Sequence, residues 1–506
     1  MNQVKAGAVL NYVIIGLNAL VGLLYTPFML RCLGQNEYGL YSLVASIIAY
    51  LTLLDFGFGP AVVRYTAKYC AEGKVKEQQS LFGLFFTLYS IIGLIAFGIG
   101  LLLYFNIDWL FDRTMSPDDL SQARTMILLL LFNLAFTFPM SVFGSIIVAY
   151  ERFIFQKSVL ILRIVISTGV LIAVLVLGFK AVALVVVQTV FNILLLMANF
   201  IYCRKKLNVK FRFDNFKWSF IRNILGFSIW VFLSDVMFKF YYNTGQFVLG
   251  ATSGTVEVAL FALGVTLMQM YIMFSGGISG VLLPKITSMV AQHKSDKEIS
   301  DLFIRTGRLQ YIVMAVILVG FLVLGKQFIF LWAGNEYSAV YYIAIIFFLS
   351  TLVPLIQNTA IAILQARNQQ KYRSLVLVMV GAFSVVIQVI LSKYYGAIGC
   401  AIAVGLANIV GQGIILNWYY HTCQHLDIIK FWKEIGKMTI VPAIVASLGY
   451  LIVGNLTIDN WLKFILAVGC IIILYIPLIW RFGMNESERQ LISQPLKRIY
   501  NKLKKV

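Results

Sequence analysis

Long apolar runs recur along the chain from its beginning almost to its end, separated by short polar stretches. A helix needs roughly 20 mostly apolar residues to cross about 30 Å of hydrocarbon, and about fourteen runs of that length follow one another here. The pattern predicts an all-α integral membrane protein whose chemistry lies between helices. The predicted spans are residues 8–30, 38–62, 80–105, 124–149, 158–178, 180–203, 221–249, 256–283, 306–325, 338–363, 373–393, 396–420, 437–454 and 460–482.

Composition agrees with this pattern. The chain is 60% hydrophobic and only 12% charged over 506 residues, whereas about a quarter of the residues of soluble domains are charged. The six cysteines are scattered without a CxxC pair, which favours neither a disulfide framework nor a metal site. We therefore expect no metal and no cofactor.

The positive charge is distributed unevenly between the two sides of the predicted membrane. The net charge is +20, but with the first residue in the cytoplasm about four-fifths of the Lys and Arg residues fall in cytoplasmic connections. This bias predicts that both termini are cytoplasmic. The basic excess is then a topology signal and a contact for anionic membrane lipids, and we expect no nucleic-acid partner.

An internal repeat with a nearly constant shift divides the chain. Leu33-Gly34 matches Leu249-Gly250, and Gly178 matches Gly396. The repeat predicts two six-helix lobes related by an axis along the membrane normal, with a cleft between them that suits alternating access. The predicted parts are an N-terminal lobe (1–215, helices 1–6), a C-terminal lobe (216–425, helices 7–12), two extra C-terminal helices (426–485, helices 13 and 14) and a basic cytoplasmic tail (486–506).

Ionisable residues at bilayer depth are costly, so they usually face a cavity or a partner. Asp235 and Lys239 lie one helical turn apart in the seventh span, a spacing that permits a local ion pair. Alternatively, Lys239 points into the cleft as an anion contact that Asp235 orients. Asn243 and Gln246 continue a polar strip suited either to sugar hydroxyls or to hydrogen bonds between helices.

A second group of charges lies in the first two spans. Asp55 is deep in the second span, Arg64 lies towards its cytoplasmic end, and Arg31 closes the first span on the far side. Arg64 either snorkels to the headgroups or contacts substrate. Because guanidinium groups bind phosphate well, a cleft with Arg31, Arg64 and Lys239 suits a substrate that bears a pyrophosphate. Other polar residues of the spans extend the list of candidate lining groups: Asn133, Gln188, Asn192, Gln269, Gln357, Asn358, Asn408 and Gln412.

Two segments carry a family likeness. LRCLGQNEYGLYSL (30–43) followed by LLDFGFGPAVVRY (53–65) resembles the opening signature of bacterial polysaccharide-export flippases. These are the Wzx-type O-antigen and capsule repeat-unit translocases of the multidrug/oligosaccharidyl-lipid/polysaccharide superfamily. The resemblance extends over essentially the whole chain, with further similar segments such as LGKQFIFLWAGNEY (324–337) and LQARNQQKYRS (364–374).

The resemblance implies a fourteen-helix transporter of the bacterial inner membrane with both termini in the cytoplasm. Its substrate would be an undecaprenyl-pyrophosphate-linked oligosaccharide, and polymerase and glycosyltransferase partners are expected. One departure concerns cation coupling: many relatives carry an Asp where this chain reads Asn243-Thr244-Gly245-Gln246. Asp55 and Asp235 then remain as the coupling candidates, and whether sodium or protons are coupled stays open.

Two other function classes compete with the flippase. A cation-coupled drug or metabolite antiporter of the same superfamily needs a carboxylate that cycles its ion, and Asp55 or Asp235 meets that need. An integral-membrane enzyme needs a catalytic constellation near the outer face, but all three histidines (His293, His421 and His425) fall at predicted cytoplasmic edges. No GxxxxGK[ST] loop is present in the sequence. The sequence therefore favours a monomeric flippase that is not an enzyme.

Overall fold

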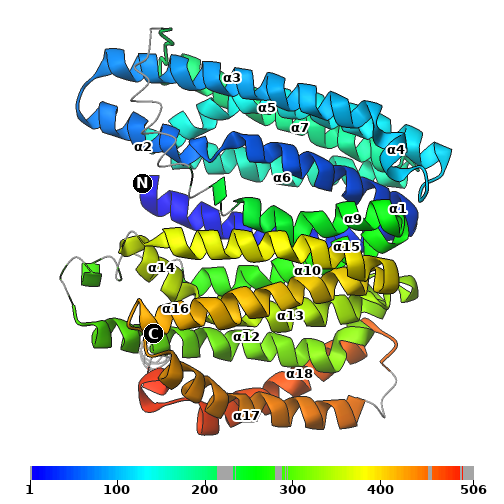
Figure 1. Cartoon of the computed structure of the whole chain (residues 1–506), viewed down its shortest axis with the longest axis vertical. Coiled ribbons are helices and arrows are strands. Elements are labelled where there is room, and N and C mark those ends of the chain that lie inside the picture. The colour runs from blue at the N-terminus through cyan, green and yellow to red at the C-terminus, as the bar shows by residue number, and fades with distance from the viewer. Residues whose placement is uncertain are drawn as a thin grey trace, which may run out of the picture. The chain divides into compact units, whose positions relative to one another are not determined.

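The computed structural model describes residues 3–213, 235–279, 294–367, 369–453 and 458–490, together with residues 229, 232, 233, 286, 288–290, 292 and 493. The described residues form helices joined by short loops, with no strand among them (Figure 1). Ten of these helices are long and apolar enough to cross a membrane, or eleven with the bent pair Val340–Ile356 and Asn358–Ala366. The predicted all-α membrane class is confirmed, whereas the count of fourteen spans stays a prediction.

Helix α1 (Gln3–Leu51) contains two predicted spans, because a continuous helix of 49 residues would extend about 72 Å. Gly34 divides it with a φ of 75° and a ψ of 175°, a conformation that costs little only for glycine. Helix α15 (Gln370–Asn408) is divided in the same way at Gly396, whose φ is 53°. Each of these two long helices is therefore interrupted at a single glycine.

The chain forms two compact units. Unit 1 consists of Met1–Leu263 and Leu377–Val404, and unit 2 consists of Gly264–Val376 and Gly405–Val506. The elements that lie wholly in unit 1 are α1, η1 (Thr52–Asp55), α2 (Phe58–Ala71), α3 (Val75–Phe105), α4 (Ile107–Phe111), α5 (Pro117–Ala149), α6 (Phe153–Val176), α7 (Ala181–Lys205), η2 (Lys239–Asn243) and α9 (Thr244–Thr252).

Unit 2 holds the rest of the described elements. These are α12 (Asp296–Trp332), η3 (Asn335–Tyr337), α13 (Val340–Ile356), α14 (Asn358–Ala366), η4 (Ile409–Ile415), α16 (Leu416–Thr422), α17 (Ile428–Val453), α18 (Trp461–Leu478) and η5 (Ile479–Gly483). Helices α10 (Thr255–Ser279) and α15 contribute residues to both units. The two six-helix lobes inferred from the sequence stay a prediction, and the tail beyond residue 490 lies almost wholly outside the described residues.

In unit 1, α5 packs against α3 on one side and α7 on another, and α1 packs against α6 (Figure 1). Helix α5 begins at a complete capping box: the Ser116 hydroxyl accepts from the Asp119 amide, and the Asp119 carboxylate accepts from the Ser116 amide. Pro117 occupies the first helical position, where its missing amide proton costs nothing. The sequence SPDD therefore fixes where the central helix of this group begins.

Two helical segments of unit 1 begin on a glutamate acceptor. The Ala181 amide, at the start of α7, donates to Glu37 Oε2 at 3.4 Å. The Ala397 amide, directly after the break at Gly396, donates to Glu257 Oε2 at 2.6 Å. An anion at a helix N-terminus is favoured by the free amides and the helix dipole. The two amides are separated along the chain by the same number of residues as Leu33-Gly34 and Leu249-Gly250 of the sequence repeat.

The surfaces of the outer helices are apolar. In α6 only Leu171 and Leu175 are buried, while Leu162, Val165 and Ile166 are exposed. Helix α18 is similar, with a long series of exposed Leu and Ile side chains. Apolar surface of this extent is stable only against hydrocarbon, so these faces identify a multi-pass membrane protein.

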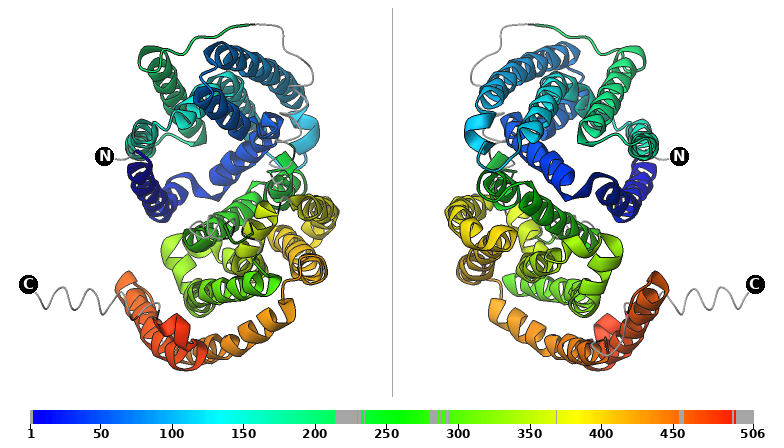
Figure 2. Two further views of the ribbon diagram at one scale, coloured as in Figure 1. Left: turned by 90° about the vertical axis from the view of Figure 1, so that its left-hand side faces the viewer. Right: turned by 90° about the vertical axis from the view of Figure 1, so that its right-hand side faces the viewer.

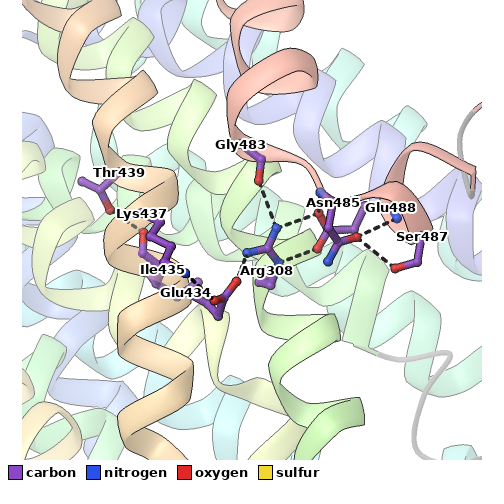
Figure 3. A network of polar contacts seen from close by, with 9 residues as sticks. All are labelled: Arg308, Glu434, Ile435, Lys437, Thr439, Gly483, Asn485, Ser487 and Glu488. Carbon is purple, nitrogen blue, oxygen red and sulfur yellow. Dashed lines mark hydrogen bonds and ion pairs between the residues drawn. The ribbon is translucent and has the colours of Figure 1, made fainter.

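A buried ion network holds three segments of unit 2 together (Figure 3). The Arg308 guanidinium on α12 donates to both carboxylate oxygens of Glu488, at 2.6 and 2.9 Å, and to Glu434 Oε2 on α17 at 2.7 Å. It also donates to the Gly483 carbonyl at 3.0 Å. Helices α17 and α18 lie next to each other (Figure 2), and α12 packs against both. Arg308 thus connects the last predicted helices to α12.

Candidate functional site

A polar cavity of about 460 Å³ lies inside unit 1 between α1, α5, α6 and α7. Its volume falls within the roughly 300–1,000 Å³ typical of small-molecule sites. Polar side chains project into it from every one of these helices and from η1. The lining residues are Asn18, Val21, Ile48, Thr52, Leu130, Asn133, Leu134, Thr137, Arg163, Ile164, Ser167, Thr168, Leu171, Gln188 and Asn192.

Arg163 is the charged group of this cavity. It lies near the middle of α6, about 15 Å along the helix axis from Phe153, and is half-buried. Among the residues that the structure describes, no carboxylate lines the cavity or pairs with this guanidinium. A charge at bilayer depth without a protein counter-ion is costly and marks a functional site by default. Arg163 therefore presents its donors to whatever enters the cavity.

The amides of the cavity are held in fixed orientations. Asn192 Nδ2 donates to Asn133 Oδ1 at 2.7 Å and to Thr137 Oγ1 at 2.8 Å. Gln188 Nε2 donates to the Tyr41 hydroxyl at 2.8 Å. These bonds join α7 to α5 and to α1, as expected for hydrogen bonds between helices, and they leave further donor and acceptor positions at the same amides. The cavity is thus preorganised for hydroxyl groups.

Asp55 lies beside this cavity, at the break between α1 and α2. The break consists of η1 followed by Phe56 and Gly57, which both have positive φ, 50° and 67°. Thr52, at the start of η1, lines the cavity, while Asp55 at its end is half-buried and accepts a hydrogen bond from Tyr89. A non-glycine residue in the left-handed region indicates a constrained backbone, here next to a membrane-embedded carboxylate.

The structure brings Asp55, Asp235 and Lys239 together, although Asp55 is far from the other two in the sequence. Asp235 is close enough to Asp55 for the two carboxylates to repel each other, and Lys239 is an electrostatic partner of Asp235. The rings of Phe56 and Phe232 also meet at 5.2 Å between centroids. Two candidate coupling residues and one candidate anion contact therefore form one charged cluster.

Lys239 begins a π-helical turn, η2. Carbonyls of this turn also accept hydrogen bonds from side chains. The Tyr50 hydroxyl donates to the Lys239 carbonyl at 3.3 Å and also bonds to Thr244 Oγ1. Gln388 Nε2 donates to the Phe240 carbonyl at 3.2 Å. Such π-helical turns inside α-helices often mark functional sites. This one begins at Lys239, a member of the charged cluster.

The other predicted site residues lie in different places. Arg31 is exposed, three residues before the break at Gly34, and the helical segment that follows separates it from Asp55 by about 24 Å. Arg64 is exposed on α2 with its guanidinium carbon 5.9 Å from the centroid of the Tyr65 ring. Asn243 and Gln246 are half-buried at the end of η2 and in α9.

Arg163 was missed because it fell near the cytoplasmic end of a predicted span, where a long basic side chain usually reaches the headgroups. The structure begins α6 at Phe153, so Arg163 is near mid-helix. The signal that identifies it is local: an Arg in the apolar run VLILRIVIS without Asp or Glu within four residues on either side.

The family of the chain is shown by comparison with known proteins. A family model described as "Polysaccharide biosynthesis protein" matches residues 4–290. The chain belongs to the polysaccharide biosynthesis protein family. This confirms the family predicted from residues 30–43 and 53–65.

Solved structures share the fold of this family member. One is lipid II flippase MurJ in an inward closed conformation, with 16% identity, a TM-score of 0.71 and coverage of 94% of this chain and 98% of that one. Another is an inward-facing multidrug resistance MATE family transporter of the MOP superfamily, with 14% identity, a TM-score of 0.60 and coverage of 82% and 95%. The MATE multidrug transporter DinF-BH matches with 15% identity, a TM-score of 0.56 and coverage of 83% and 95%. No curated protein matches the chain.

Proposed function

We propose that this protein is a flippase that moves an undecaprenyl-pyrophosphate-linked oligosaccharide across the bacterial inner membrane by alternating access. The repeat unit would serve O-antigen, capsule or exopolysaccharide synthesis. The observation that carries the proposal is the cavity in unit 1, where one cation and several amides and hydroxyls meet between membrane-embedded helices. Family membership and the fold shared with a lipid II flippase support it.

The physical need for such a cavity follows from the substrate. Sugar hydroxyls and phosphates lose their hydration when they leave water, and each unpaired polar group in hydrocarbon costs several kcal/mol. Side chains that donate and accept at fixed positions replace that hydration. We assign the phosphate contacts to Arg31, Arg64 and Lys239 and further polar contacts to Asn243 and Gln246, in different conformations of one transport cycle.

Energy coupling is assigned to the charged cluster. Because the sequence holds no nucleotide-binding loop of the GxxxxGK[ST] kind, we propose that a gradient or substrate consumption on the far side drives transport. Asp55 and Asp235 are the groups that would exchange a proton or sodium ion, with Tyr89 and Lys239 as their neighbours. We propose a monomer with both termini in the cytoplasm, in contact with anionic lipids and with polymerase and glycosyltransferase partners, that carries its substrate without converting it.

Deletion of the gene in its host tests the function. Mass spectrometry of the undecaprenyl-linked glycans, with and without the restored gene, should show one complete repeat unit that accumulates and is cleared by complementation. When the deletion strain is complemented with Lys239→Ala or Arg64→Ala at unchanged protein level, the lipid-linked repeat unit should still accumulate for at least one of the two variants. Lys393→Ala, on the opposite side in the predicted topology, serves as the matched control. An unchanged lipid pool in a strain that makes such a polymer contradicts the proposal.

The charged cluster also supports a second candidate, a cation-coupled drug or metabolite antiporter of the same superfamily. A MATE family transporter shares the fold, and the Asp55–Asp235 cluster is suited to holding a cation. The antiporter predicts drug sensitivity on deletion and an unchanged lipid-linked glycan pool. The flippase predicts unchanged drug sensitivity on deletion and accumulation of a lipid-linked glycan.

A further inference from the structure

The polar cavity of unit 1 has an imbalance of charge, and this imbalance indicates the charge of the ligand. Arg163 alone is charged among the lining residues that the structure describes, and the other polar groups are neutral amides and hydroxyls. The guanidinium has no carboxylate partner within the described residues. Because an uncompensated charge is unfavourable in a low-dielectric site, the ligand should supply the missing negative charge.

The number of charges distinguishes between the two anionic groups that such a substrate offers. A diphosphate carries more than one negative charge and would leave an excess that neutral amides do not compensate. A sugar carboxylate carries one, and its two oxygens match the planar fork of an arginine. The charge count of the cavity therefore fits a monocarboxylate.

The neutral groups of the cavity fit the rest of a sugar. Asn133, Gln188 and Asn192 come from two helices and are fixed by bonds to Thr137 and Tyr41. Amides of this kind donate and accept at once, as adjacent sugar hydroxyls require. A volume of about 460 Å³ has room for a ligand of one or two sugar residues.

We infer that this cavity is a saccharide subsite selective for an acidic sugar, whose carboxylate binds Arg163 and whose hydroxyls bind the neighbouring amides. The inference rests on the proposed flippase function and adds the chemical class of the repeat unit. The diphosphate is then held elsewhere, by the cations assigned above.

The test begins with the glycan that accumulates in the deletion strain. Its mass and composition should include a sugar that bears a carboxylate. The oligosaccharide is then released from its lipid by mild acid, and half of it is carboxyl-reduced to the neutral form. Both forms are titrated into the purified full-length protein in lipid nanodiscs, with binding followed by saturation-transfer NMR. The acidic form should bind at least tenfold more tightly, as expected for a charge-assisted hydrogen bond.

Three variants separate charge from folding. Arg163→Gln should bind the two forms equally, whereas Arg163→Lys should retain part of the preference for the acidic form. Arg152→Gln removes an exposed arginine at the start of the same helix and should behave as the unchanged protein. A single symmetrical gel-filtration peak is the criterion that a variant is folded. If Arg163→Gln does not fold, Arg163→Lys still tests the role of the charge.

Each contrary result has a distinct meaning. A repeat unit without a carboxylate overturns the inference and leaves the flippase intact. So does equal binding of both forms to the unchanged protein, or displacement of the acidic form from Arg163 by inorganic pyrophosphate at equal concentration. If no lipid-linked glycan accumulates, the proposed function fails and the inference fails with it.

Discussion

Replacement of Arg308 by methionine should destabilise unit 2 strongly. Arg308 is only 5% exposed and its partner Glu488 is fully buried at 0%. Removal of the guanidinium leaves the Glu488 carboxylate in a low-dielectric site without its cation. Breaking a buried pair from one side costs about 3–5 kcal/mol. If unit 2 unfolds cooperatively, the corresponding fall in Tm is on the order of 8 °C.

The assay is thermal unfolding of the purified full-length protein in detergent, followed by fluorescence-detected gel filtration. Lys430→Met is the matched control, since it breaks the Lys430–Asp301 pair, whose partners are 51% and 52% exposed. An exposed pair contributes about 0–1 kcal/mol, so Tm should hardly change.

A double variant tests the electrostatic reason. Arg308→Met combined with Glu488→Leu removes the stranded charge, and should recover most of the lost stability because apolar replacements of buried pairs are often neutral. The argument is refuted if Arg308→Met has the same Tm as the Lys430→Met control. It is also refuted if the Tm of the double variant is no higher than that of Arg308→Met alone.

Three further substitutions have defined outcomes. Gly39→Ala should lower the yield of folded protein sharply, because the new methyl group would overlap the Thr255 carbonyl in the backbone; gel-filtration yield measures this. Glu257→Ala should cost about 1–2 kcal/mol, since the Ala397 amide loses its acceptor; thermal unfolding measures this. Asp55→Asn should leave Tm within a few degrees but reduce transport at least tenfold, measured by clearance of the accumulated lipid-linked glycan.

Matched controls accompany these variants. Gly16→Ala places a methyl group where no atom lies within 4 Å, and should not reduce the yield. Asp118→Ala removes an exposed carboxylate in the first turn of α5, and should cost less than Glu257→Ala. If Asp55→Asn clears the glycan at the normal rate, Asp55 has no coupling role.

The candidate site could be predicted only in part. Asp55, Asp235 and Lys239 were identified as costly intramembrane charges from their place in apolar runs, and Asn133, Gln188 and Asn192 as candidate lining groups. That the first three share one cluster was not visible, because Asp55 belongs to the second predicted span and Asp235 to the seventh. Such contacts arise from packing between helices, which hydropathy does not encode.

The boundaries of the spans show the same limit. Single apolar runs predicted separate helices on either side of Gly34, and the structure confirms the change of direction there through a φ of 75°. For Arg163, by contrast, the predicted helix boundary gave the wrong position within the helix. A shift of a few residues in the start of α6 moves this side chain from the headgroups to mid-helix, and hydropathy does not locate helix ends that closely.

The sequence by itself determined that this protein lies in a membrane, that it is helical, and to which family it belongs. Long apolar runs must form helices in lipid, because every backbone polar group there needs an internal partner, and this is a local property of each run. Only the tertiary structure decided where charges meet: Arg163 in its cavity, Asp55 beside Asp235, and Arg308 between Glu434 and Glu488. Those arrangements depend on which helix faces pack together, a choice set by side chains that are far apart along the chain.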